Sequence, residues 1–201
     1  MKKNIGLIFI LSLFLLFSIN VQAQSIRLGL GGGLTSLTSP NYYTDNISNG
    51  AYGFKGNYHF GLIAKLNIPL LPITPAVFID YHYLNSSGKF DSAEVSYSQR
   101  IFSIGIEGEW DFLSLPVVKP YLLVNVALNN FGELNATTSN QIFGQPSFTR
   151  YGAGFGIGTV LSVIPSMDLD LSAKYNFMNL VGKKSGEGSI NAFTLNLLIL
   201  F

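Results

Sequence analysis

Cysteine is absent from the 201-residue chain, and charged residues make up only 11% of it. Without cysteine, a disulfide framework and a thiolate metal site are both excluded. The two histidines leave few other ligands for a transition metal, so we expect neither a metal site nor a cofactor. Basic and acidic residues nearly balance, at 12 and 11, which argues against a nucleic-acid partner.

Long apolar runs are missing beyond the first 20 residues, so no later segment predicts a transmembrane helix. The N-terminus has a different pattern: residues 1–4 are basic, residues 5–19 are almost continuously apolar, and Val21-Gln22-Ala23 has the small-x-small pattern of a cleavage site. This order is typical of a secretory signal peptide. We expect residues 1–23 to be cleaved and residues 24–201 to form a single domain.

Helical periodicity is also lacking in the mature chain, where no apolar pattern lies between helix start and stop signals. The stretch YGAGFGIGTV at residues 151–160 has glycine at every second position, as if it were a dinucleotide-binding loop. Its glycines miss the offsets of zero, two and five that such a loop requires, and no helical pattern follows. A period of two is the period of a β-strand, so we predict an all-β protein.

Alternation of apolar and other residues predicts eight strands with connections of two kinds. The strands are expected at residues 26–34, 58–68, 76–84, 97–111, 118–129, 150–160, 168–179 and 190–201. Short proline-containing turns alternate with long polar stretches at residues 35–57, 85–96, 130–147 and 181–189. Transmembrane β-barrels show this asymmetry, with short periplasmic turns and long extracellular loops.

One face of the predicted strands is apolar, and the other is rich in glycine. The glycines at these second-face positions are Gly29, Gly31, Gly61, Gly105, Gly152, Gly154, Gly156 and Gly158. Glycine weakens a water-facing strand and packs against nothing. In a narrow lumen, however, it leaves room for long side chains from other strands. We therefore expect the apolar face to contact lipid and the glycine face to line the lumen.

The same inward positions carry charges of both signs. The basic members are Arg27, Lys65, Lys119, Arg150 and Lys174, and the acidic members are Asp80, Glu107, Glu109, Asp168 and Asp170. Because an unpaired buried charge is costly, we expect these residues to form a network of ion pairs in the lumen. We interpret the network as structural rather than catalytic.

Several segments together resemble the small eight-stranded outer-membrane barrels of the OmpA-like and OmpX-like kind from Gram-negative bacteria. The segments are the signal peptide, KPYLLVNVAL, RYGAGFGIGTVL, MDLDLSAKYNFM and the C-terminal FTLNLLILF. The resemblance implies an eight-stranded antiparallel up-and-down transmembrane β-barrel in the outer membrane. It also implies that Phe201, with Ile199 and Leu197 before it, is a signal for the barrel-assembly machinery.

The same resemblance implies a non-enzymatic monomer in contact with outer-membrane lipid and lipopolysaccharide. Its role would be structural, or a surface interaction through extracellular loops such as Asn41-Tyr42-Tyr43 and residues 135–141, which we expect to be polar and mobile. A wide pore is not expected, because eight strands leave an interior that side chains just fill.

Two other functions stay open at this point. A lipid-modifying enzyme of the acyltransferase or deacylase type would need a nucleophile, a base and an acid within hydrogen-bond reach. His59 and His82 are the candidate bases, and Asp80 shares the inward face with His82. A soluble periplasmic lipocalin-like barrel would bind a ligand inside, but the inward glycines disfavour it.

Overall fold

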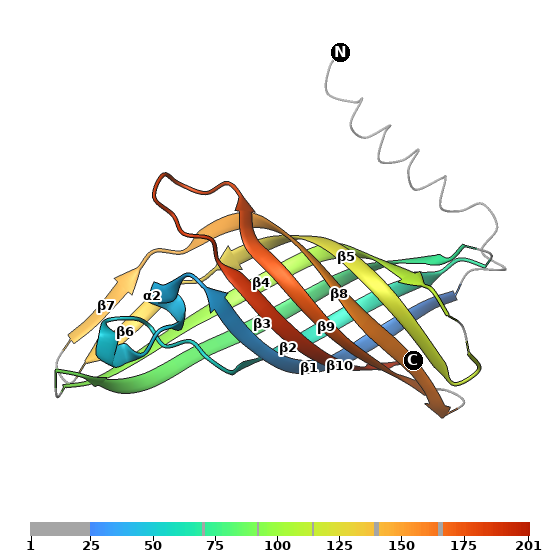
Figure 1. The fold of residues 1–201 in the computed structure, drawn as a ribbon, viewed down its shortest axis with the longest axis horizontal. Helices are drawn as coiled ribbons and strands as arrows, with labels where there is room; N and C mark the ends of the chain where they lie inside the picture. The colour runs from blue at the N-terminus through green and yellow to red at the C-terminus, as the bar shows by residue number, and fades with distance from the viewer. Residues whose placement is uncertain (1–24, 70, 92, 114, 139–140, 165–166) are drawn as a thin grey trace, which may run out of the picture.

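A computed structural model of the chain shows a closed antiparallel barrel (Figure 1). The structure describes residues 25–201 apart from 70, 92, 114, 139–140 and 165–166. The predicted signal peptide at residues 1–23 lies outside the described residues and stays a prediction. None of the described residues belongs to a helix with the length and hydropathy of a membrane span.

Eight strands of the described chain form the barrel wall. They are β1 (Ser25–Ser39), β2 (Asn57–Asn67), β3 (Ile73–Phe90), β4 (Ala93–Asp111), β5 (Val118–Phe131), β8 (Phe148–Ile164), β9 (Met167–Val181) and β10 (Asn191–Leu200). Each strand pairs antiparallel with its neighbours in this order, and β1 pairs with β10 to close the wall. Closure satisfies the backbone hydrogen bonds within the wall, as crossing a membrane requires.

The alternation of the wall strands matches the prediction. On β4, Phe102, Ile104, Ile106 and Trp110 are exposed on the outer surface, while Ser103, Glu107 and Glu109 are buried inside. On β10, the second face also carries the apolar Leu198 and Leu200, and both point inward, where they pack with Phe78 and Tyr121. The outer surface is therefore an apolar belt, and the lumen holds both the charges and a small apolar core.

The prediction of long loops at residues 85–96 and 130–147 was wrong, because both segments contain strands. β3 and β4 continue as paired strands over residues 85–90 and 93–96, β6 (Leu134–Thr138) pairs with the outer part of β4, and β7 (Gln141–Gln145) pairs with β6. Beyond the apolar belt, outward positions meet water and carry Ser, Thr and Asn, so the polar composition hid the strand period. Figure 1 shows β6, β7 and α2 together at this end of the barrel, which we call the long-loop end.

The segment Asn41-Tyr42-Tyr43 is also not the mobile loop that was expected. It forms α2 (Asn41–Thr44), which is followed by the short helix η2 (Ile47–Asn49). Tyr43 and Phe54, from this segment and the residues after it, are buried at 4% and 0% exposure. Their large rings give the segment enough apolar surface to fold back onto the barrel.

Candidate functional site

Near the short-turn end, four side chains from four strands meet in the lumen; we call them the Lys65 cluster (Lys65, Glu109, Tyr121 and Asp170). The Lys65 ammonium lies 2.5 Å from Glu109 Oε1 and 2.6 Å from Asp170 Oδ2. The Tyr121 hydroxyl donates to Asp170 Oδ1 at 2.6 Å, and the Tyr121 ring lies under the ammonium, 4.9 Å away. Every charge of the cluster thus has an oppositely charged neighbour, which offsets the cost of burying it.

The other predicted charged residues lie at different depths. Lys174 pairs with Glu107 at 2.6 Å, and Arg27 pairs with Asp168. Asp80 lines a cavity of about 20 Å³ together with Lys174 and His82. Lys119 lines a cavity of about 280 Å³ at the short-turn end, together with Arg27 and Asp111. Arg150 lies apart from all of these, near the long-loop end.

The inward glycines make room for these side chains. Gly158 pairs across the strands with Tyr121, and a Cβ on Gly158 would overlap the Tyr121 ring. A Cβ on Gly61 would lie 2.5 Å from Asp80 Oδ1. At these two positions the lumen is therefore filled to contact, and a larger residue would displace the facing side chain.

Gly158→Ala is expected to destabilise the barrel by about 1–3 kcal/mol, because the added methyl group overpacks the lumen against Tyr121. The matched control is Gly108→Ala, since a Cβ there would meet only Ile73, at 4.0 Å. Urea unfolding of the barrel refolded in lipid vesicles measures both variants. Equal effects of the two substitutions would contradict the role assigned to Gly158.

Both histidines lie higher in the lumen and are joined by a threonine that sequence reasoning missed. Thr35 Oγ1 lies 2.9 Å from His59 Nδ1 and 2.8 Å from His82 Nδ1, and His59 Nε2 lies 2.7 Å from Asn196 Oδ1. Asn196 Oδ1 only accepts, so His59 carries its proton on Nε2, and Thr35 donates to His59 Nδ1 while it accepts from His82 Nδ1. Thr35, His59 and His82 are 0%, 2% and 3% exposed. This arrangement fixes the two histidines relative to each other inside the lumen.

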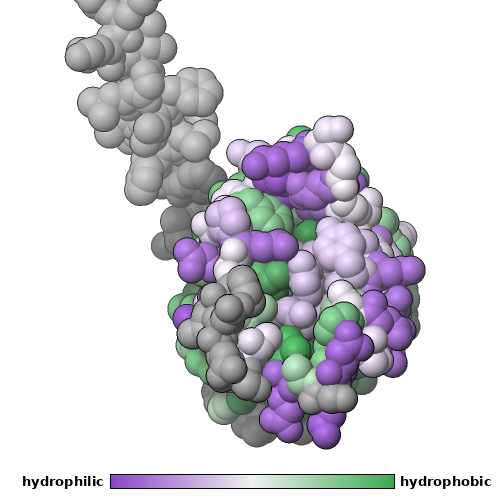
Figure 2. Space-filling view, turned by 90° about the vertical axis from the view of Figure 1, so that its left-hand side faces the viewer, coloured by the Kyte–Doolittle hydropathy of each residue, from purple (hydrophilic) through white to green (hydrophobic). Residues whose placement is uncertain are grey.

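At the long-loop end, a second apolar core closes the barrel mouth; we call it the mouth core. Its buried members are Leu37, Tyr43, Phe54, Leu84, Ile101, Phe131, Leu134, Met178, Ile190 and Ala192. Tyr52 packs at its edge, with ring centroids 5.3 Å from Tyr43 and 5.1 Å from Tyr97. Figure 2, seen from this end, shows hydrophilic surface around the rim and more apolar surface between. The mouth is thus covered by packed side chains.

The comparisons with known proteins agree with this architecture. The profile of the outer membrane protein β-barrel domain family matches residues 9–201. The chain belongs to this family. It is an outer-membrane β-barrel protein, its apolar belt lies in lipid, and its long-loop end is extracellular. No curated protein matches the chain by sequence.

Solved structures of outer-membrane barrels are similar to this one in fold. Neisserial surface protein A matches with a TM-score of 0.59 and 19% identity, over 89% of this chain and 98% of that one. A major outer membrane protein from Thermus thermophilus matches at 0.56 and 12%, over 88% and 99%. Ail, the attachment invasion locus protein of Yersinia pestis, matches at 0.51 and 12%, over 90% and 100%. At such identities the likeness concerns the fold alone.

The C-terminus of this outer-membrane barrel completes the wall. Phe201 exchanges two backbone hydrogen bonds with Leu28, at 2.8 and 3.0 Å, and its side chain is 55% exposed on the outer surface. Ile199 and Leu197 precede it on the same face. The assembly-signal role of Phe201, Ile199 and Leu197 stays a prediction.

One extracellular connection is held by an ion pair that the sequence did not suggest. Glu187, between β9 and β10, accepts from Arg150 Nε at 2.9 Å and from Arg150 Nη2 at 2.5 Å. Asn179 Nδ2 and the Lys184 amide also donate to Glu187, at 3.0 and 3.1 Å. The hydrogen bonds from Arg150 lower the pKa of Glu187 from its ordinary 4.5 to about 2. Residues 182–189 are thereby attached to β8.

This pKa shift predicts that the connection loosens in acid. A carboxyl group with a lowered pKa in the folded state stabilises that state above pH 4.5, and the contribution is lost as the pH falls toward 2. Hydrogen exchange at residues 182–189, corrected for intrinsic rates, should therefore be slower at pH 6 than at pH 3. Glu187→Gln should abolish the difference, whereas Glu133→Gln, at an exposed carboxylate, should keep it. A wild-type connection equally protected at both pH values would contradict the assignment.

Proposed function

We propose that this outer-membrane barrel is a non-enzymatic surface-interaction protein that binds its ligand on the extracellular extension of its sheet. The observation that carries the proposal is the length of two strands. A transmembrane strand needs about 9–11 residues, whereas β3 has 18 and β4 has 19. Phe90 is seven positions beyond Tyr83, so at about 3.3 Å per residue β3 continues for about 23 Å along its own axis past its last outward aromatic residue.

The interior supports a surface role over transport. The Lys65 cluster and the apolar side chains around Leu198 block the lumen next to the cavity of about 280 Å³ at its periplasmic end, and the mouth core covers the extracellular end. An eight-stranded wall leaves no further width for a channel. We infer that the barrel serves as a support for the extension, and that it does so as a monomer assembled by the barrel-assembly machinery.

Shortening the extension tests the proposal. The variant replaces residues 87–96 by a two-residue turn, which keeps Tyr97 and the mouth core. Cells expressing wild-type or shortened barrels at equal surface level are compared for attachment to immobilised glycans, matrix proteins and other bacterial cells. We expect attachment to at least one surface to fall tenfold or more. The control replaces the periplasmic turn at 112–116, and attachment that is equal with and without the extension would refute the surface role.

The lipid-enzyme alternative has its own test. Since Thr35, His59 and His82 are buried among lumen side chains, His82→Ala is expected to leave lipid A and phospholipid acylation unchanged. Mass spectrometry of outer-membrane lipids from expressing cells measures this. A change in acyl composition that depends on His82 or His59 would replace the present proposal by a catalytic one.

A further inference from the structure

The cavity of about 280 Å³ at the periplasmic end of the lumen borders the Lys65 cluster, because Lys65 and Glu109 line it. Pro69 and Leu71, in the turn between β2 and β3, line it as well and are exposed. The cluster and the apolar side chains around Leu198 block the lumen next to it. The cavity is therefore a pocket that is open to the periplasm alone, and we call it the periplasmic pocket.

Two buried side chains at the periplasmic pocket have polar atoms without a partner. Thr74 is 8% exposed and Glu109 is 2% exposed, and the two residues pair across β3 and β4 on the inner side. The Thr74 hydroxyl makes no hydrogen bond to a described residue, and Glu109 accepts from Lys65 through Oε1 alone. Since buried polar groups are nearly always hydrogen-bonded, we expect the missing partners inside the pocket.

Two charged side chains at the pocket also lack a counter-charge. Asp111 and Lys119 line it, and neither side chain forms an ion pair or a hydrogen bond with a described residue. The other basic residues of the pocket, Arg27 and Lys65, are both held in ion pairs. Asp111 pairs across the strands with Tyr121, two positions after Lys119. The two unpaired charges therefore stem from diagonal positions on neighbouring strands, about 7–8 Å apart.

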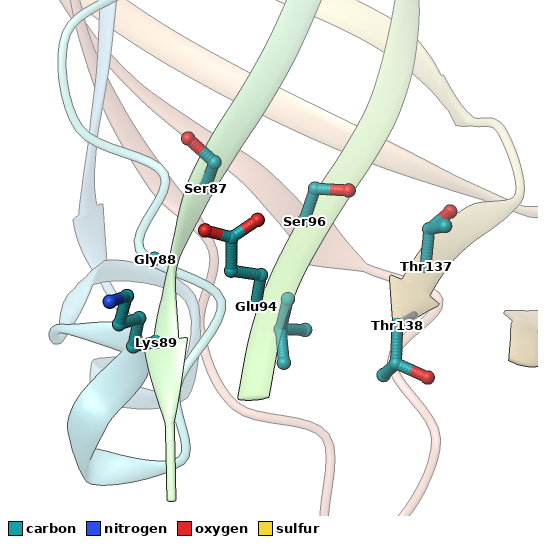
Figure 3. A pocket seen from close by; sticks show the side chains of 8 residues that line it. Ser87, Gly88, Lys89, Glu94, Ser96, Thr137 and Thr138 are labelled. Atoms are coloured by element: carbon teal, nitrogen blue, oxygen red, sulfur yellow. The ribbon is translucent and has the colours of Figure 1, made fainter. Parts of the chain in front are cut away.

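A larger hollow on the extracellular extension lacks these features. It has a volume of about 470 Å³, and Figure 3 shows Ser87, Ser96 and Thr137 around it on neighbouring strands. All three residues are exposed, so water satisfies their hydroxyl groups. The periplasmic pocket differs because its unsatisfied groups are buried. It also lies at the opposite end of the barrel, so an inference about it does not depend on the proposed function.

The charges of the periplasmic pocket indicate its ligand class. A ligand with only negative charge would meet the two carboxylates of β4, and one with only positive charge would meet three basic side chains. Water can satisfy the Thr74 hydroxyl, but it neutralises neither Asp111 nor Lys119. An α-amino acid carries an ammonium group and a carboxylate together, and so supplies the counter-charge for both. We propose that the periplasmic pocket binds a free amino acid in its zwitterionic form.

Each part of such a ligand has a place in the pocket. The ammonium group binds beside Glu109 and Asp111, which lie two positions apart on the inner side of β4. The carboxylate accepts a charge-assisted hydrogen bond from the Lys119 ammonium. Leu71 and Val160 form an apolar part of the wall, so the favoured amino acid has an apolar side chain. Pockets for drug-sized ligands have about 300–1,000 Å³, and the volume of about 280 Å³ suits a single amino acid.

The test measures binding of L-leucine to the purified barrel in phosphatidylcholine nanodiscs. Leucine is titrated while backbone amide signals are followed by NMR, and we expect saturable shifts around Thr74 and Asp111. N-acetyl-leucine lacks the ammonium group and leucinamide lacks the carboxylate. Each should therefore bind at least tenfold more weakly than leucine.

Three variants assign the two ends of the ligand. Lys119→Met should weaken leucine binding at least tenfold and change the binding of leucinamide, which has no carboxylate, by less than twofold. Asp111→Asn should likewise weaken leucine binding, and it should change the binding of N-acetyl-leucine by less than twofold. The matched control is Lys89→Met, which removes a lysine from the extracellular extension and should change leucine binding by less than twofold.

Several results would overturn the inference. No saturable binding of leucine would leave water as the occupant of the pocket, and equal binding of leucine and leucinamide would contradict the role of Lys119. Tighter binding of O-phosphoethanolamine would indicate a lipid headgroup instead of an amino acid. If Lys119→Met does not fold, as judged by its gel mobility before and after heating, Lys119→Gln replaces it with the same expectation. Leucine binding and cell attachment are measured at opposite ends of the barrel, so the two proposals fail separately.

Discussion

Replacing Lys65 with methionine is expected to destabilise the refolded barrel by about 3–5 kcal/mol, the cost of removing one partner from a buried ion pair. Lys65 is 2% exposed, and its ammonium is held between the carboxylates of Glu109 and Asp170. Methionine retains most of the side-chain volume of lysine, so the loss of stability comes from the missing ion pairs rather than from a cavity. Urea unfolding in lipid vesicles, where the folded and unfolded forms separate on a gel, gives the free energy.

Two further variants show whether the loss comes from the unpaired carboxylates. Lys119→Met removes a lumen lysine that is only half-buried at the periplasmic mouth, and should change stability by less than about 0.5 kcal/mol. Lys65→Met/Glu109→Gln removes one of the two stranded charges and should recover part of the loss, since Asp170 keeps its hydrogen bond from Tyr121. If Lys65→Met were as mild as Lys119→Met, the Lys65 cluster would contribute nothing to folding.

The sequence predicted the faces of the strands well and the pairing across the lumen poorly, for a physical reason. A period of two assigns Lys65, Glu109 and Asp170 to the inner face from each strand alone. Which of them meet depends on the stagger of β2, β4 and β9 around the closed wall. These three strands are not neighbours, and no pattern in the sequence indicates their relative stagger. The same period places Tyr121 on the inner face, but its hydrogen bond to Asp170 depends on the register of β5 and β9 around the wall.

The extracellular end was harder to predict, because water rather than lipid surrounds it. There the outward positions are polar, so the strands of the extension have the composition of a loop. Tyr43 and Phe54 of the mouth core, and Ile47 and Ala51 between them, are buried at intervals of three or four residues. This helix-like spacing was a signal in the sequence, although the helices in this segment are short and separate. Glu187 lies in a glycine-rich connection without periodicity, and nothing in the sequence indicated that Arg150 would bind it.

The remaining large effect concerns the outer face of the wall. Ile106→Arg is expected to destabilise the barrel by about 2–4 kcal/mol, the cost of placing arginine near the bilayer midplane. Ile106 is 60% exposed on the outer surface, and its cross-strand neighbours Val77 and Val126 are 51% and 52% exposed. In water such a face would tolerate an arginine easily, so the loss depends on the lipid.

Ser96→Arg is the matched control, since Ser96 lies on the same face of the same strand, ten residues away and above the apolar belt. Outside the membrane that arginine should cost about 0–1 kcal/mol. Both variants are measured in the same vesicles and introduce the same residue on the same strand face. The difference between their unfolding free energies therefore reports the effect of depth in the bilayer. If Ser96→Arg cost as much as Ile106→Arg, the outer face of β4 would not pass from lipid to water between these residues. The extension would then lie in the membrane, and the proposed surface interaction would lose its support.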